Sequence, residues 1–177
     1  MTSGFTRAAI ALHWLTVLLM AFAFGLGLSL AWLKVPEPLK LPMFLSHEWL
    51  GVAILGVALV RLIWRRRHPP PPPLPGPAWQ HLVATLVHAG IYGLLIATPV
   101  VGWIASTALG FPVVWLGVIP LPDFGRNMDL GWQALWVHRR LAWALGILIA
   151  MHVGAALMHH LVFRDDTLRR MAPWLRR

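Results

Sequence analysis

The sequence predicts an all-α integral membrane four-helix bundle, a single domain over residues 1–177 with both termini in the cytoplasm. Its mean hydropathy is +0.68, and only 12% of its residues are charged, about half the share found in soluble domains. A helix of about 20 apolar residues spans the hydrocarbon core of a bilayer. The chain has four apolar runs of that length, at roughly residues 8–33, 43–64, 79–108 and 133–163.

The first run, residues 8–33, has a signal peptide as its competing interpretation, because Ser29 to Ala31 loosely fit a small-x-small cleavage site. The run is longer than a usual signal-peptide core, and cleavage would discard His13. We therefore interpret it as a membrane helix. Prolines within residues 34–42 are expected to stop this helix and to form a short loop.

The second run, residues 43–64, is followed by a basic cluster and by the consecutive prolines Pro69–Pro73. These prolines have no amide donors, so they favour an extended polyproline II connector. After the third run, 79–108, residues 110–130 include several polar and charged positions and are interpreted as an external loop. The fourth run, 133–163, leads into a basic amphipathic tail.

Basic residues are divided unevenly between the two sides of this topology. The side with both termini and the polyproline connector has ten Lys and Arg against two acidic residues, a net charge of +8. The opposite side has five against four, a net charge of +1. The positive-inside rule places the more basic side in the cytoplasm. Membrane orientation therefore explains the overall charge of +9 better than nucleic-acid binding does.

The absence of cysteine limits the redox cofactors that the chain can hold. It excludes disulfides, cysteine-ligated iron–sulfur clusters and haem attached covalently through a C-x-x-C-H motif. Histidine, with nine residues, is the abundant ligand. Zinc is disfavoured, because it takes four protein ligands, or three with water, and no well-placed carboxylate completes such a set.

The fourth run carries His138 and His152, whose spacing suits two sites stacked across a bilayer. The fourteen residues between them correspond to about 21 Å along a helix and bring them within about 40° of one face. In the predicted topology His47 lies at the depth of His138, near the external side, and His13 lies at the depth of His152. Each pair joins two helices, as bis-histidine haem ligation requires.

Each of these histidines has a purely structural alternative, since a lone histidine in a membrane helix is often hydrogen-bonded to a neighbouring helix. Pairing by depth favours ligation, because a buried imidazole without a partner costs about 1–3 kcal/mol. Small residues near the histidines would leave room for a flat macrocycle. Small residues also serve ordinary helix packing in lipid, so this second observation does not separate the alternatives.

Four stretches of the chain resemble the small bacterial cytochrome b561 family, four-helix di-haem proteins of the cytoplasmic membrane. The stretches are Ala11–Leu15, Arg61–Arg65 with the prolines after it, His88–Gly102 and His159–Met171. The resemblance implies a bacterial inner-membrane location and two haem b groups, with metal ligands at His13, His47, His138 and His152.

The resemblance also implies single-electron transfer across the membrane, with ubiquinone as the acceptor. Part of the family resembles a superoxide:ubiquinone oxidoreductase, so we expect an oxidoreductase that oxidises superoxide at the external side, or else a non-catalytic electron carrier. Arg126, Arg139 and Arg140 lie close to His138 in the predicted topology and would steer a small anion. Neutralising haem propionates, or lying at an ordinary membrane surface, is their competing role.

His159 is the preferred quinone-binding residue. It lies two helical turns beyond His152 and within about 20° of the same face, where it can donate a hydrogen bond or a proton. His160 points about 80° away and is the weaker candidate.

The connector lysine expected from the family is missing, since residues 74–77 read Leu-Pro-Gly-Pro. His68 and His81 are the available substitutes. His88 has no partner at matching depth in the predicted topology, so we interpret it as structural or propionate-binding.

Two other functions remain open. One is a haem-bearing membrane anchor or electron-transfer subunit for a soluble dehydrogenase or hydrogenase, although the short external loops offer little docking surface. The other is a haem-free histidine transporter or proton relay. The expected partners are membrane lipid and quinone, and the sequence identifies no protein partner.

Overall fold

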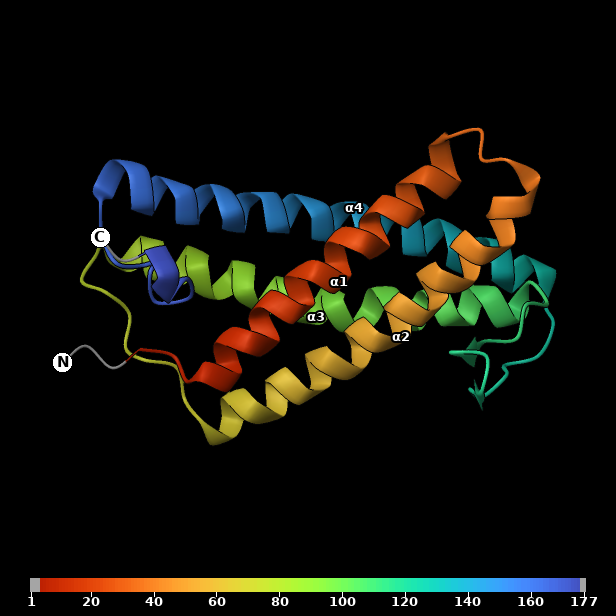
Figure 1. The fold of residues 1–177 in the computed structure, drawn as a ribbon, viewed down its shortest axis with the longest axis horizontal. Helices are drawn as coiled ribbons and strands as arrows, with labels where there is room; N and C mark the ends of the chain where they lie inside the picture. Colours follow the sequence, from red (N-terminus) through yellow and green to blue (C-terminus); the bar gives the residue numbers. More distant parts are fainter. Residues whose placement is uncertain (1–3, 176–177) are drawn as a thin grey trace.

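The computed structural model describes residues 4–175 and consists mainly of long helices (Figure 1). The helices are α1 (Arg7–Trp32), α2 (Glu37–Arg67), α3 (Ala78–Ala108) and α4 (Met128–Met158). Within the described residues, four helices are long and apolar enough to cross a membrane. The prediction of an all-α membrane four-helix bundle is therefore confirmed.

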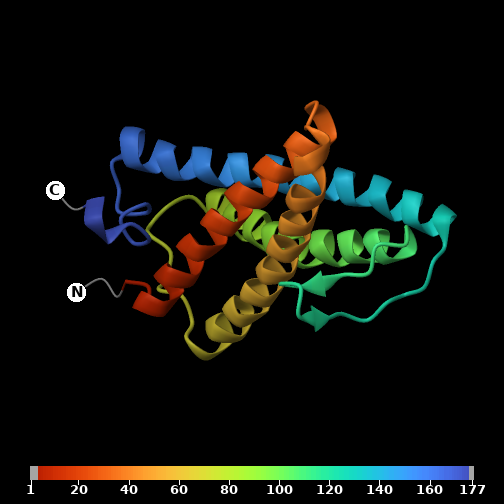
Figure 2. The same ribbon diagram turned by 45° about the vertical axis from the view of Figure 1, so that its right-hand side comes forward.

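The helices pack in chain order, α1 on α2, α2 on α3 and α3 on α4. The two chain ends and the polyproline connector lie at one end of the bundle, opposite the α1–α2 turn (Figures 1 and 2). A small core joins all four helices; its buried residues are Met20, Ala23, Ile54, Ala58, Leu95 and Leu145. Large apolar side chains such as Phe22, which is 66% exposed, cover the outside, as expected for a surface in contact with lipid.

The loop predicted at residues 34–42 is mostly helical, and this prediction is wrong beyond residue 36. Helix α2 begins at Glu37. Pro38 lies in the first turn, where the missing amide donor is not needed. Pro42 lies inside the helix and removes a single hydrogen bond, to the carbonyl group four residues earlier. The turn between α1 and α2 is therefore only residues 33–36.

The segment predicted as an external loop, residues 110–130, also contains more structure than a loop. Strands β1 (Val114–Trp115) and β2 (Ile119–Pro120) form a short antiparallel hairpin. Helix α4 begins earlier than expected, at Met128, because the Asn127 side chain accepts a hydrogen bond from the Leu130 amide and caps the helix.

Helix α4 does not continue regularly to residue 163. It ends at Met158 and continues as η1 (His159–Phe163), a single π-helical turn. Arg164 then adopts a left-handed backbone conformation, with φ of 55°, and turns the chain away. A short 3₁₀ segment, η2 (Pro173–Leu175), follows in the tail. The tail is attached to α1 because Trp14 Nε1 donates to the Met171 carbonyl group at 2.8 Å.

Candidate cofactor sites

An outer pair of histidines joins α2 to α4. The ring centroids of His47 and His138 are 6.1 Å apart, and the ring planes lie at 89°. His47 Nδ1 is 2.9 Å from the Ala23 carbonyl oxygen, and His138 Nδ1 is 2.9 Å from the Thr98 carbonyl oxygen. A carbonyl oxygen only accepts, so both Nδ1 atoms carry the proton and both Nε2 atoms keep a lone pair. Imidazoles that bind a metal through Nε2 have this arrangement.

An inner pair joins α1 to α4. The ring centroids of His13 and His152 are 6.2 Å apart, with the planes at 66°. The Arg61 guanidinium approaches this pair from α2, with Nη2 at 3.4 Å from His13 Nδ1. The structure thus brings together the same two pairs of histidines that the topology had matched by depth.

The separation within each pair fits one metal between two imidazoles. A histidine nitrogen binds a transition metal at about 2.0 Å and lies about 1.1 Å from its ring centroid, so two rings on opposite sides of one metal have centroids about 6.3 Å apart. The observed separations are 6.1 and 6.2 Å. Within residues 4–175 no group of three or more His, Asp or Glu residues is placed to hold a metal ion. Two protein ligands at each level suit an iron whose other ligands come from a porphyrin.

The helices that carry the paired histidines have widely spaced backbones. Among the described residues, no Cα atom of α4 lies within 8 Å of a Cα atom of α1 or α2, although α3 and α4 pack closely. The imidazoles therefore meet between helices whose backbones are widely spaced, while core side chains, such as Phe24 of α1 beside Gly146 of α4, also connect these helices. The residues present fit a haem b at each level.

Two glycines lie against the outer pair, and neither was predicted as a site residue. A Cβ atom at Gly27 would lie 3.0 Å from His47 Cε1, and one at Gly102 would lie 2.8 Å from His138 Nδ1. Real Cβ atoms essentially never approach as closely as 2.8 Å, so an alanine at residue 102 forces the His138 ring to move. Gly102 ends one of the stretches that resemble the cytochrome b561 family, and this position is the sequence feature that could have indicated its role.

His88 is a third histidine at the inner level, so the prediction that it lacks a partner at matching depth is wrong. Its ring centroid lies 5.1 Å from that of His152. His88 lies about 15 Å from the start of α3, and His152 lies about 16 Å from Phe163, at the same end of the bundle. A separation of 5.1 Å is too short for two rings on opposite sides of one metal. We therefore regard His88 as a neighbour of the inner pair.

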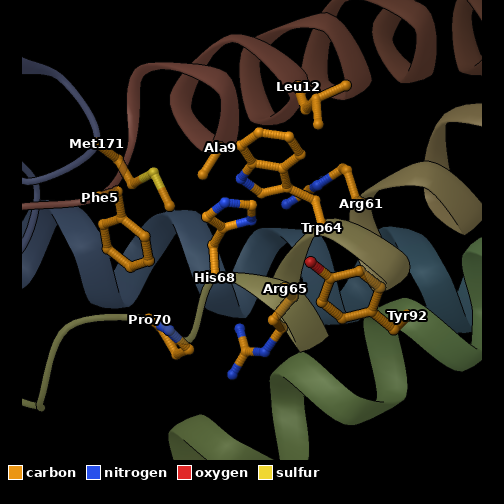
Figure 3. Close-up of a pocket in the computed structure, with 10 residues that line it drawn as sticks. All are labelled: Phe5, Ala9, Leu12, Arg61, Trp64, Arg65, His68, Pro70, Tyr92 and Met171. Carbon is orange, nitrogen blue, oxygen red and sulfur yellow. The ribbon is translucent and has the colours of Figure 1, made fainter.

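A cavity of about 50 Å³ opens beside the inner level, between α1, α2 and α3 (Figure 3). Arginine, histidine and tyrosine side chains line it together with apolar residues: Phe5, Ala9, Leu12, Arg61, Trp64, Arg65, His68, Pro70, Tyr92 and Met171. His68 stacks on Trp64 with the ring centroids 4.1 Å apart. His68 thus lines this cavity, whereas His81 and His159 do not.

His159 lies at the junction of α4 and η1 and is held by an acidic side chain. Its Nδ1 atom is 2.5 Å from Asp165 Oδ2, and its ring centroid is 5.1 Å from that of Phe163. Burial acts to raise the pKa of Asp165, but hydrogen bonds from His159 and Thr167 outweigh it and lower this pKa below its usual value. The neighbouring His160 Nδ1 is buried without a hydrogen-bond partner among residues 4–175.

The three arginines predicted at the external side are all exposed. Arg126 packs beside Gly110, where a Cβ atom would lie 3.6 Å from Arg126 Nε. Gly110 has a φ of 93°, which favours glycine at this turn. The Arg140 guanidinium lies 4.8 Å from the ring centroid of Trp136. None of the three forms an ion pair with an acidic side chain within residues 4–175.

The fold and these sites define a membrane-spanning four-helix bundle with paired histidines at two levels. Residues 4–174 match the family described as prokaryotic cytochrome b561. The chain is 33% identical to cytochrome b561 homolog 2 of Escherichia coli (strain K12), over 91% of this chain and 87% of that protein. It is also 33% identical to homolog 1 of the same strain, over 96% and 97%, and to a probable superoxide oxidase, CybB, of Yersinia pestis, over 93% of each.

The chain therefore belongs to the prokaryotic cytochrome b561 family, as its sequence motifs had indicated. It is a bacterial multi-pass membrane protein of a family that binds haem b and transfers electrons in the membrane.

Proposed function

We propose that this chain is a di-haem b-type cytochrome of the bacterial inner membrane that carries single electrons from the external side to ubiquinone. His47 and His138 hold the outer haem, and His13 and His152 hold the inner one. The observation that carries this proposal is the separation of the ring centroids, 6.1 Å and 6.2 Å, in two pairs that share helix α4. The positive-inside rule places both termini in the cytoplasm.

The roles of the protein in this reaction are binding and orientation. A bound haem supplies the reversible one-electron chemistry of its iron. The carbonyl groups of Ala23 and Thr98 keep the Nδ1 protons in place and leave both Nε2 atoms of the outer pair able to bind a metal. The apolar outer face of the bundle keeps water away from both levels.

Superoxide is the proposed electron donor. The Yersinia pestis relative is named as a probable superoxide oxidase. Arg126, Arg139 and Arg140 are exposed cations at the end of the bundle next to the outer pair, where they attract a small anion. Two superoxide ions each lose one electron and become dioxygen. One ubiquinone gains these two electrons and two protons and becomes ubiquinol.

Ubiquinone is proposed to bind near His159. Asp165 holds Nδ1 of this ring in place, and the other ring nitrogen is the proposed donor of a hydrogen bond or a proton to a quinone oxygen. A π-helical turn begins at His159, and such turns are frequent at functional sites.

A reduced-minus-oxidised absorption spectrum, combined with the haem-to-protein ratio of the purified chain, tests the two haem sites. We expect two haem b per chain. His138→Ala and His152→Ala should each retain one, because each change removes a ligand from a different pair. A ratio of one in the unaltered protein contradicts the proposal, and absence of haem supports a haem-free transporter or proton relay.

The purified chain, supplied only with a superoxide source and a short-chain ubiquinone, tests the reaction. We expect ubiquinol to form at a rate that falls as ionic strength rises, because salt screens the arginines from the anion. Ubiquinol formation that requires an added dehydrogenase or hydrogenase instead supports the role of an electron-transfer subunit.

His159→Ala tests the quinone site. We expect both haems to remain in the spectrum while quinone reduction falls about a hundredfold or more, the range found when a proton-transferring side chain is removed. His160→Ala, at the adjacent position, is the matched control and should retain most of the rate. Unchanged quinone reduction by His159→Ala would remove the assignment.

A further inference from the structure

The two histidine pairs have opposite electrostatic surroundings. Both outer imidazoles face backbone carbonyl oxygens through Nδ1, at 2.9 Å each. The inner imidazole of His13 instead faces the Arg61 guanidinium, whose Nη2 lies 3.4 Å from Nδ1. One pair therefore contacts the negative ends of dipoles, and the other contacts a full positive charge.

Arg61 is held in this position by two other helices. Its Nη1 donates to Thr16 Oγ1 on α1 at 3.0 Å, and Cζ lies 5.3 Å from the Tyr92 ring centroid on α3. Thr16 is itself only 4% exposed and donates to the Leu12 carbonyl group at 2.7 Å. Among the described residues, no acidic side chain forms an ion pair with Arg61. An arginine side chain remains protonated in proteins, so this positive charge is permanent.

These surroundings act in opposite directions on the reduction potential of a bound iron. A carbonyl oxygen that accepts a hydrogen bond from Nδ1 makes the imidazole a stronger electron donor to the metal. This stabilises the oxidised metal. A guanidinium has only donors, so it cannot accept a hydrogen bond from Nδ1. Its positive charge favours the reduced state, because reduction removes one positive charge from the metal, and the low dielectric of the bundle strengthens the effect.

We propose that Arg61 raises the reduction potential of the inner haem above that of the outer haem and so directs electrons from the external side inward. This proposal rests on the proposed function, since it needs a haem at each histidine pair. Arg61 acts through the His13 imidazole and the local field, so it is a tuning residue. Arg65 lines the cavity of Figure 3 together with Arg61, and its positive charge acts in the same direction.

The test is a spectroelectrochemical titration of the haem absorption band in the purified holoprotein. We expect two potentials, of which the higher belongs to the inner haem. His152→Ala, which retains only the outer haem, identifies the lower one. Arg61→Gln should shift the higher potential downward and leave the lower one in place, whereas Arg61→Lys should retain most of the higher value. Arg66→Gln removes an exposed arginine of the same helix that does not line the cavity, and it should shift neither potential.

The haem-to-protein ratio separates this proposal from the one on which it rests. Fewer than two haems in the unaltered protein contradicts the proposed function. Two haems with an unmoved inner potential in Arg61→Gln, or with the inner haem as the lower of the two, contradicts only the role of Arg61. If Arg61→Gln loses haem, Thr16→Val removes the hydrogen bond that fixes Nη1. A smaller downward shift in Thr16→Val supports the proposal, and no shift overturns it.

Discussion

Main-chain carbonyl groups and two glycines orient the histidines of the outer pair. The Thr98 carbonyl oxygen fixes the Nδ1 side of His138, and Gly102, one helical turn further along α3, leaves the space that this ring occupies. His47 has the same kind of environment on α1, from the Ala23 carbonyl oxygen and Gly27. An imidazole is thus oriented by a donor–acceptor contact on one side and by the absence of a Cβ atom on the other.

Gly102→Ala should therefore disturb the outer pair selectively. The new Cβ atom would lie 2.8 Å from His138 Nδ1, so the ring must turn away from the Thr98 carbonyl group and from its partner. We expect the haem-to-protein ratio to fall from two toward one. Gly93→Ala is the matched control in the same helix, because a Cβ atom there meets nothing within 4 Å. It should keep both haems and gain about 0.5–1 kcal/mol of helix stability. Equal haem content in the two variants would show that Gly102 does not position His138.

At the scale of elements, the β1–β2 hairpin is attached to the helix that carries His47. Trp49 Nε1 donates to the Val114 carbonyl group at 2.9 Å, and Trp115 Nε1 donates to the Trp49 carbonyl group at 3.1 Å. Ser106 on α3 adds contacts to Glu48 and to the Phe111 carbonyl group. The hairpin therefore connects α2 and α3 at the end of the bundle next to the outer pair, where a donor would arrive.

Trp49→Phe should loosen this attachment while keeping the aromatic volume. It removes one hydrogen bond, so we expect a loss of about 0.5–1.5 kcal/mol in stability. Hydrogen–deuterium exchange should become faster in residues 110–122 and stay unchanged in α1. Trp132→Phe serves as the control, since this side chain is 59% exposed and makes no hydrogen bond within the described part of the chain. Faster exchange throughout the bundle in Trp49→Phe would argue against a local role.

At the scale of the whole molecule, the bundle has two chemically different ends. The polyproline connector, the arginine-rich end of α2 and the basic tail lie together, and Arg170 Nη1 donates to the Pro72 carbonyl group at 2.7 Å. The other end has the α1–α2 turn and the hairpin (Figures 1 and 2). The proposed electron transfer from an external donor to quinone depends on which end faces which compartment.

Single cysteines test this orientation, because the native chain has none. Val118→Cys lies in the hairpin, where Val118 is 78% exposed, and Pro73→Cys lies in the exposed connector. In intact spheroplasts we expect a membrane-impermeant maleimide to label Val118→Cys and to leave Pro73→Cys unlabelled. After the membrane is opened with detergent, both should be labelled. The reverse pattern in intact spheroplasts would place the termini outside.

The sequence already predicted the helical membrane bundle, because apolar run length and basic-residue asymmetry are properties of the chain read in one dimension. The matching depths of His13 with His152 and of His47 with His138 were predictable in the same way, since the rise per residue along a helix is nearly constant. The start of α2 was not predictable from the sequence, because Pro38 and Pro42 are tolerated near the start of a helix, where few helical hydrogen bonds are lost.

The sequence by itself determined the class of protein, the number of membrane helices and the levels at which the four paired histidines lie. Only the tertiary structure decided which atoms surround each imidazole: the Thr98 carbonyl oxygen and Gly102 at His138, Arg61 at His13 and His88 at His152. The physical reason is that depth depends on position along one helix, whereas a contact depends on how neighbouring helices are rotated and spaced. Packing between helices sets that rotation and spacing.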